Sequence, residues 1–126
     1  AEIKHCFIVL FFKEETMAIV NAAILTTDTT LLTVPSGKKF ALTTLLVCNT
    51  GVNDGTGSND TKVDVHIIPD GAVKTTDNLI LNDLEIGSAD TFTFSAERLI
   101  LEAGDRVLLV GQAPTNLSAT LSYLEV

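Results

Sequence analysis

Apolar and polar residues alternate along much of this chain, in short runs separated by turn-forming residues. In KVDVHII, residues 62–68, the apolar side chains share one side of the run: Val63, Val65 and Ile67. The same period of two recurs in TFTFS (91–95) and in NLSATLSYLEV (116–126). Because the side chains of a β-strand point alternately to opposite faces, these runs predict strands with one buried face.

Other runs are apolar on both faces. They are LTTLLVCN (42–49), LIL (79–81), RLIL (98–101) and RVLLVG (106–111). We interpret these runs as central strands, or as strands that are covered on both sides. Two covered faces would imply a sandwich that also contacts a neighbouring subunit.

Turn signals separate the runs. Pro35 and Gly37 lie in VPSGKK, Pro69 precedes Asp-Gly in IPDGA (68–72), and EAGDR (102–106) contains a further Gly-Asp pair. Such residues supply the backbone angles of tight turns. We count about eight strands after Met17 and little or no helix. The chain is therefore predicted to be all-β, with residues 17–126 forming a single antiparallel β-sandwich that is jelly-roll-like.

Residues 1–16 do not share this texture. They contain the apolar run Ile3 to Phe12, followed by Lys-Glu-Glu-Thr and the chain's one methionine, Met17. The codons for residues 13–17 can form a purine-rich ribosome-binding sequence ahead of a start codon, so residues 1–16 are either a mis-annotated leader or an apolar arm. If they are an arm, we expect Phe7, Val9 and Phe11 to pack as one strand face.

The net negative charge of the chain excludes some classes of binding partner. The chain carries 8 Lys+Arg and 16 Asp+Glu, a net charge of -8. This field repels phosphate backbones and anionic lipid headgroups, so we predict no nucleic-acid partner and no membrane partner. The two cysteines, Cys6 and Cys48, are too few for a disulfide scaffold, and we expect Cys48 to be a small buried apolar residue.

The chain shows no catalytic constellation. Its two histidines are His5 and His66, and we expect His66 to lie on a solvated or interfacial strand face. No nucleophile, phosphate-binding or dinucleotide-binding motif is present. Several carboxylates between residues 83 and 105 are close in sequence, but sequence proximity does not create the spacing that glycosidases need. We predict no enzyme activity, no catalytic residue and no cofactor.

The loop NTGVNDGTGSND, residues 49–60, is the strongest candidate for a metal site. Asp54, Asn59 and Asp60 offer the hard oxygen ligands that calcium prefers. Their spacing matches neither an EF-hand nor a Gly-Asp calcium repeat. The alternative is a solvated loop in which Gly and Asn supply positive φ angles. We predict no metal site, and keep these three residues as calcium candidates.

Several ordered motifs resemble those of a known group of proteins. They are LLTVPSGKKFALTTLLVCNTG, VDVHIIPDGA, LILEAGDRVLLV and NLSATLSYLEV, and the resemblance that they carry covers residues 22–126. In this order they are similar to small single-domain β-sandwich virion proteins of tailed bacteriophages, including cyanophage-like members. That resemblance implies a structural role in the virion, as a capsid decoration protein or as a tail-associated protein. The motifs are turn and core motifs, and they do not cover residues 1–16.

Three functions follow for comparison. The first is a capsid decoration or cement protein that binds the major capsid protein, or another virion protein, as a homo-oligomer, most simply a homotrimer. The alternative is an adaptor or receptor-binding module of a tail, baseplate or fibre. A carbohydrate-binding module is disfavoured, because the chain has no Trp and one Tyr for stacking on sugars.

Overall fold

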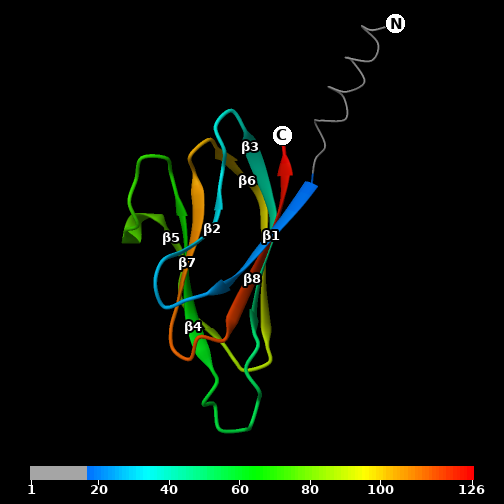
Figure 1. Ribbon diagram of the computed structural model, residues 1–126, viewed down its shortest axis with the longest axis vertical. Helices are drawn as coiled ribbons and strands as arrows, with labels where there is room; N and C mark the ends of the chain where they lie inside the picture. The colour runs from blue at the N-terminus through cyan, green and yellow to red at the C-terminus, as the bar shows by residue number, and fades with distance from the viewer. Residues whose placement is uncertain (1–16) are drawn as a thin grey trace, which may run out of the picture.

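Eight β-strands and one turn of 3₁₀-helix form the described part of the chain (Figure 1). The computed structural model describes residues 17–126, with side chains from residue 18 on, apart from residues 96–98. The elements are β1 (Met17–Ile24), β2 (Thr29–Thr33), β3 (Lys39–Asn49), β4 (Thr61–Ile68), η1 (Thr76–Asn78), β5 (Leu79–Ile86), β6 (Thr91–Glu102), β7 (Arg106–Gly111) and β8 (Leu117–Glu125). The expectations for Phe7, Val9 and Phe11 lie outside the described residues.

The strands form two antiparallel sheets of four that pack against each other. One sheet has the order β1-β8-β3-β6 and the other β2-β7-β4-β5. The chain passes from one sheet to the other at most of its connections, so strands that are neighbours in a sheet are often far apart in sequence (Figure 1). This is the order of a jelly roll. The predicted all-β sandwich is confirmed.

The core lies between the sheets, and the period-2 runs line it as predicted. Val63 and Val65 of β4 are 1% and 0% exposed. From the facing sheet, β8 contributes Leu117, Ala119 and Leu121, all nearly fully buried. Fully burying an aliphatic side chain of this size contributes about 1.5–3 kcal/mol, so the alternation itself holds the two sheets together.

The predicted turns form where Gly and Pro occur. The amide of Asp105 donates to the carbonyl of Glu102 (3.0 Å), which closes the Gly-Asp turn between β6 and β7. Gly104 in this turn has φ +88°, and a Cβ there would overlap the carboxyl group of Asp70. Only glycine satisfies both the angle and the close approach.

For two of the four runs that are apolar on both faces, the first interpretation, a central strand, is wrong, and the second, a strand covered on both sides, stays a prediction. β3 and β7 are central, but β5 and β6 are sheet edges. The outward residues Ile80 of β5 and Ile100 of β6 are 40% and 55% exposed. An apolar outward face shows that a strand has a side to cover. It does not show that neighbouring strands lie on both edges.

Candidate functional site

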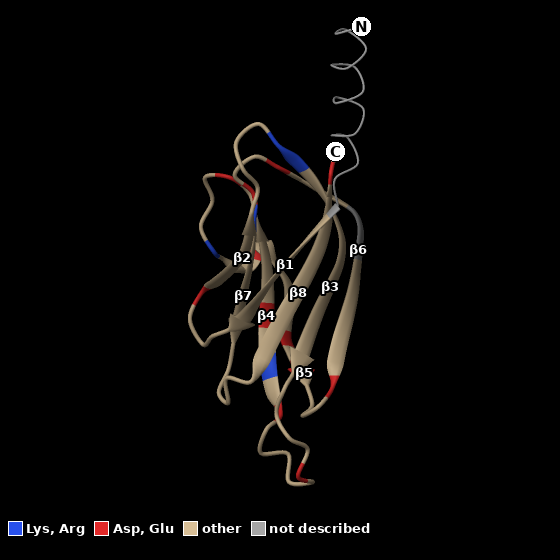
Figure 2. Cartoon of the chain, turned by 45° about the vertical axis from the view of Figure 1, so that its right-hand side comes forward, with Lys and Arg blue, Asp and Glu red and all other residues tan. Residues whose placement is uncertain are grey.

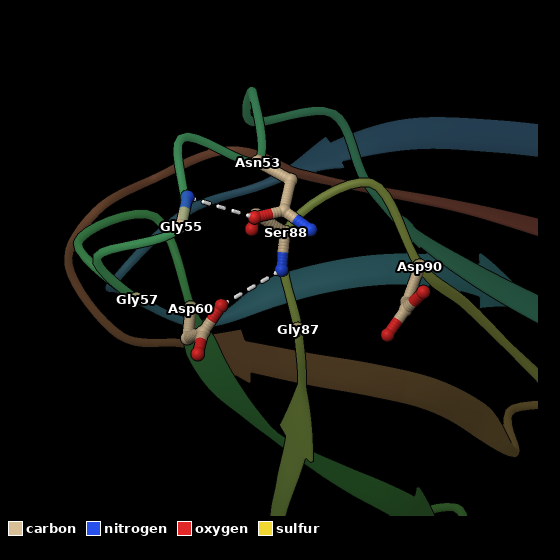
Figure 3. Close-up of a pocket in the computed structure, with 7 residues that line it drawn as sticks. All are labelled: Asn53, Gly55, Gly57, Asp60, Gly87, Ser88 and Asp90. Carbon is tan, nitrogen blue, oxygen red and sulfur yellow. Dashed lines mark hydrogen bonds between the residues drawn. The ribbon is translucent and has the colours of Figure 1, made fainter.

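A polar hollow of about 330 Å³ lies where the loop before β4 meets the turn between β5 and β6. Figure 3 shows its lining, which is polar or glycine throughout: Asn53, Gly55, Gly57, Asp60, Gly87, Ser88 and Asp90. One carboxylate oxygen of Asp60 accepts the backbone N–H of Ser88 (2.9 Å), which joins the two sides of the hollow. Sequence reasoning did not identify Ser88, because nothing local indicates that its turn faces the loop.

The buried side chain of Asn49 positions this loop. Its Nδ2 donates to the carbonyls of Asn59 (2.8 Å) and Ile86 (3.0 Å), and its Oδ1 accepts the N–H of Gly51 (2.8 Å). Asn49 is 1% exposed. Three satisfied hydrogen bonds explain how a neutral polar side chain is tolerated at the end of a core strand.

The three calcium candidates do not converge on one point. Asp54 turns into its own loop, where its oxygens accept from Thr56 and Ser58. The Nδ2 of Asn59 donates to the carbonyl of Val52 (2.7 Å). Of the three, Asp60 alone lines the hollow. Among the described side chains, which leave out residues 96–98, no three His, Cys, Asp or Glu are grouped as metal ligands.

The hydrogen bonds of the loop change the acidity of Asp54. Its Oδ1 accepts both the hydroxyl of Thr56 (2.6 Å) and the N–H of Thr56 (3.0 Å). These bonds favour the charged carboxylate and lower the pKa of Asp54, with the Thr56 hydroxyl as the largest cause. The acidic side chain therefore organises the loop by capping nearby donors.

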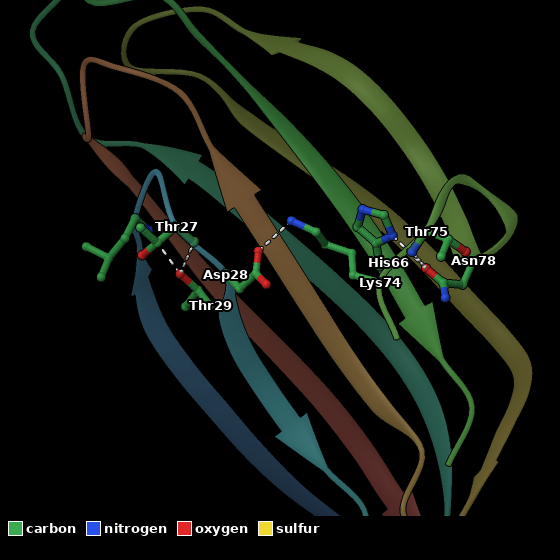
Figure 4. A network of polar contacts seen from close by, with 8 residues as sticks. Thr27, Asp28, Thr29, His66, Lys74, Thr75 and Asn78 are labelled. Atoms are coloured by element: carbon green, nitrogen blue, oxygen red, sulfur yellow. Dashed lines mark hydrogen bonds and ion pairs between the residues drawn. The ribbon is translucent and has the colours of Figure 1, made fainter. Parts of the chain in front are cut away.

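His66 is buried, so the expectation of a solvated or interfacial histidine was wrong. It is 6% exposed, because the segment between β4 and β5 folds back across its side of the sheet. Its Nδ1 lies 2.8 Å from the Oδ1 of Asn78 (Figure 4). That oxygen also accepts the N–H of Thr75, while the Nδ2 of Asn78 donates to Val73. An acceptor at this position makes the Nδ1 of His66 the donor.

Further contacts fix this covering segment, residues 69–78. Lys74 pairs with Asp28 at 2.5 Å, and Arg106 donates to the carbonyl of Ala72 at 3.1 Å. Beside His66 remains a hollow of about 300 Å³ with mixed lining: Asp64, His66, Lys74, Thr75, Thr76, Leu79, Asn82 and Val110. Lys74 already has a carboxylate partner, so the hollow offers no unpaired positive charge to an anion.

The outer face of the β1-β8-β3-β6 sheet carries no charge among its described side chains over four cross-strand rows. We call this surface the uncharged face. Its rows are Ala23, Ser118, Cys48 and Thr91; Asn21, Thr120, Leu46 and Thr93; Ile19, Ser122, Thr44 and Ser95; and Leu124, Ala41 and Ile100. Residues 96–98 of β6 are outside this description. Figure 2 shows the four strands tan over most of their length, with charged residues near their ends and on the other sheet.

Apolar side chains stand exposed on the uncharged face. Ile19 is 68% exposed and Leu46 is 37% exposed, on strands that flank β8 on either side. Cys48 also points outward and is half-buried, so its expected place in the core was wrong. Charge returns at the end of the face, where Lys39 and Glu102 form an ion pair of 3.5 Å.

The sequence matches no family model and no curated protein. Among solved structures, it is similar to a chain of the acidic stable capsid structure of the Helicobacter pylori bacteriophage KHP30. The two chains are 15% identical, the match covers 88% of this chain and 86% of the other, and the TM-score is 0.44. None of the described residues 17–126 forms a helix long and apolar enough to span a bilayer.

Proposed function

We propose that this chain is a structural protein of a bacteriophage particle, and that it decorates the capsid. In this role it binds the major capsid protein from outside and stabilises the shell. It acts as a homo-oligomer, with a trimer on a threefold axis of the shell as the simplest arrangement. The proposal joins the sequence resemblance to phage virion proteins with the surface of the folded chain.

The uncharged face carries the proposal. Although the chain is acidic, the four described rows on the outward side of the β1-β8-β3-β6 sheet carry no charged side chain, and Ile19, Leu46 and Ile100 are exposed there. Burying apolar surface contributes about 25 cal/mol for each Å² removed from water. Charged groups are costly to remove from water and are depleted at the centre of protein interfaces, so a face without them suits a component of an assembly.

The fold and the polar clusters are consistent with this role. Jelly rolls occur among viral capsid domains, although the same architecture also occurs in lectins and enzymes, so the fold alone does not assign function. The buried polar groups described above serve the structure: Asn49 holds a loop and His66 holds the covering segment. Neither is paired with a second group that would make it a nucleophile or a base.

Fractionation of the native particle tests the proposal. Purified phage would be separated into heads and tails, and each fraction searched for the chain by intact-mass spectrometry. Recovery from heads, together with rebinding of the purified chain to heads that lack it, is the expected result. Recovery from tails alone would support the tail, baseplate or fibre alternative. Absence from both fractions would overturn the proposal, and binding to a glycan array would then point to the carbohydrate-binding alternative.

A further inference from the structure

We infer that the uncharged face is the surface through which copies of this chain associate with one another. This inference deepens the proposed function and rests on it for the expectation that the chain works as an oligomer. The occupant of the face is therefore a second copy of the chain, meeting it through the same face.

The net negative charge of the chain favours a second copy as the partner at this face. Each copy has 16 Asp+Glu against 8 Lys+Arg, so two copies repel each other through most orientations. The repulsion is smallest where the fewest charges meet, and the described rows of the uncharged face carry none. A basic partner, in contrast, would gain most by binding the acidic surfaces and would leave this face exposed.

The sizes of the side chains on the uncharged face are suited to contact with the same face of a second copy. Strand β8 contributes small outward residues, Ser118, Thr120 and Ser122, to the middle of the face. Larger apolar side chains rise on both sides of it, Ile19 from β1 and Leu46 from β3. The small residues of β8 leave room for Ile19 and Leu46 of another copy, so side chains of two copies can interdigitate as they do between the sheets of a sandwich.

The size of the face predicts reversible association. Four strands that each occupy about 4.8 Å give a width of roughly 19 Å, and four rows that each occupy two residues give a length of roughly 26 Å. Each copy would then bury on the order of 500 Å², or about 1,000 Å² for a pair, which is below the standard size of a stable interface. We therefore expect micromolar association of the isolated chain, strengthened where a shell holds several copies together.

Threefold closure is compatible with these dimensions. Three faces about 19 Å wide, arranged as a triangular prism, lie roughly 5 Å from the axis, which is half the spacing of about 10 Å between packed sheets. The side chains of the three faces would then fill the space at the axis. Twofold packing of two faces at the full spacing buries the same surface, so the measured mass decides between dimer and trimer.

The test uses sedimentation velocity on the full chain, with Leu46→Arg and Thr93→Arg as variants. These residues are direct neighbours across β3 and β6, and Thr93 is exposed, so its variant should fold even if the other does not. The control is Thr33→Arg, which places the same charge at an exposed position of β2, in the other sheet. Far-UV circular dichroism would establish that each variant is folded.

We expect a dimer or trimer of the wild-type chain in the micromolar range. Raising the salt concentration should strengthen it, because salt screens the repulsion between the acidic copies and the described rows offer no ion pair across the contact. Each face variant should associate at least about tenfold more weakly, since an unpaired guanidinium would have to lose its water in the contact. The control should behave as the wild type does.

Three outcomes would overturn the inference: a monomer at every concentration, an oligomer unaffected by both face variants, or association that weakens as salt is added. A monomer that still binds phage heads would overturn this inference and the homo-oligomer of the proposed function, but it would leave capsid decoration standing, with the face assigned to the shell or to residues 1–16. An oligomer that is absent from particles would do the reverse.

Discussion

Replacing Asn49 tests how the polar loop is attached to the core. The side chain is 1% exposed and makes three hydrogen bonds, to the N–H of Gly51 and to the carbonyls of Asn59 and Ile86. Asn49→Ala removes all three hydrogen bonds and leaves their partner groups in a region with little access to water. The carbonyl of Asn59 keeps a second donor, the Nδ2 of Asn116, at 3.2 Å.

The magnitude follows from these bonds. A buried neutral hydrogen bond contributes about 0.5–1.5 kcal/mol net, and a partner left unsatisfied costs about 1–3 kcal/mol. With one of the three partners still bonded, Asn49→Ala should lower the free energy of unfolding by roughly 2–4 kcal/mol. The matched control is Asn53→Ala in the same loop. Asn53 is exposed and accepts one local bond, from the N–H of Gly55, so its loss should cost about 0.5 kcal/mol or less.

Asn49→Asp tests the two donated hydrogen bonds separately, because aspartate has nearly the shape of asparagine but lacks the NH₂ group that donates them. The carboxylate can still accept from Gly51, but it can no longer donate to the carbonyls of Asn59 and Ile86, which now repel it. Burial and these carbonyls raise the pKa of the introduced carboxyl above its unfolded value. A raised folded-state pKa means that stability is present at low pH and is lost as pH rises through that pKa. The variant should therefore be less stable than Asn49→Ala at neutral pH and should recover on acidification.

Urea unfolding monitored by far-UV circular dichroism measures all three variants, since the chain has no Trp and one Tyr to report by fluorescence. The wild type would be titrated over the same pH range as a reference for the other acidic groups. An Asn49→Ala variant within about 0.5 kcal/mol of the wild type would refute the reasoning. So would an Asn49→Asp variant whose deficit does not shrink at acidic pH.

Two other predictions concern turns and acidity. In thermal unfolding, Gly104→Ala should destabilise the fold by about 1–3 kcal/mol more than Gly71→Ala. Both glycines have a positive φ, but a Cβ would meet Asp70 only at Gly104. Equal losses of stability in the two variants would contradict this prediction. An NMR titration of Asp54 should give a midpoint below the ordinary aspartate pKa, which Thr56→Val raises. The stability that Asp54 contributes is then present at neutral pH and is lost as pH falls through the lowered pKa. An unchanged midpoint in Thr56→Val would exclude the Thr56 hydroxyl as the cause of the lowered pKa.

The hydrophobic pattern by itself determined the class of fold. Alternation in residues 62–68 and 116–126 predicted which side chains enter the core, and Val65 and Ala119 are both fully buried there. The turns at Pro35, Pro69 and Gly104 were predicted from residues whose backbone angles are nearly fixed or unusually free. These features are local, so they can be read without knowing which strands are neighbours.

Tertiary structure decided which distant segments meet. It placed Ser88 against the loop of Asp60, and it folded residues 69–78 over His66, which the sequence pattern had assigned to an open face. It also made β5 and β6 edge strands, although each contains a run that is apolar on both faces. The uncharged face is the clearest case. Its rows combine residues as far apart as Asn21 and Thr120, and only the register between β1 and β8 brings them onto one surface. Periodicity reports which way a side chain points, whereas sheet order reports what lies beside it, and the second depends on contacts between segments far apart in the chain.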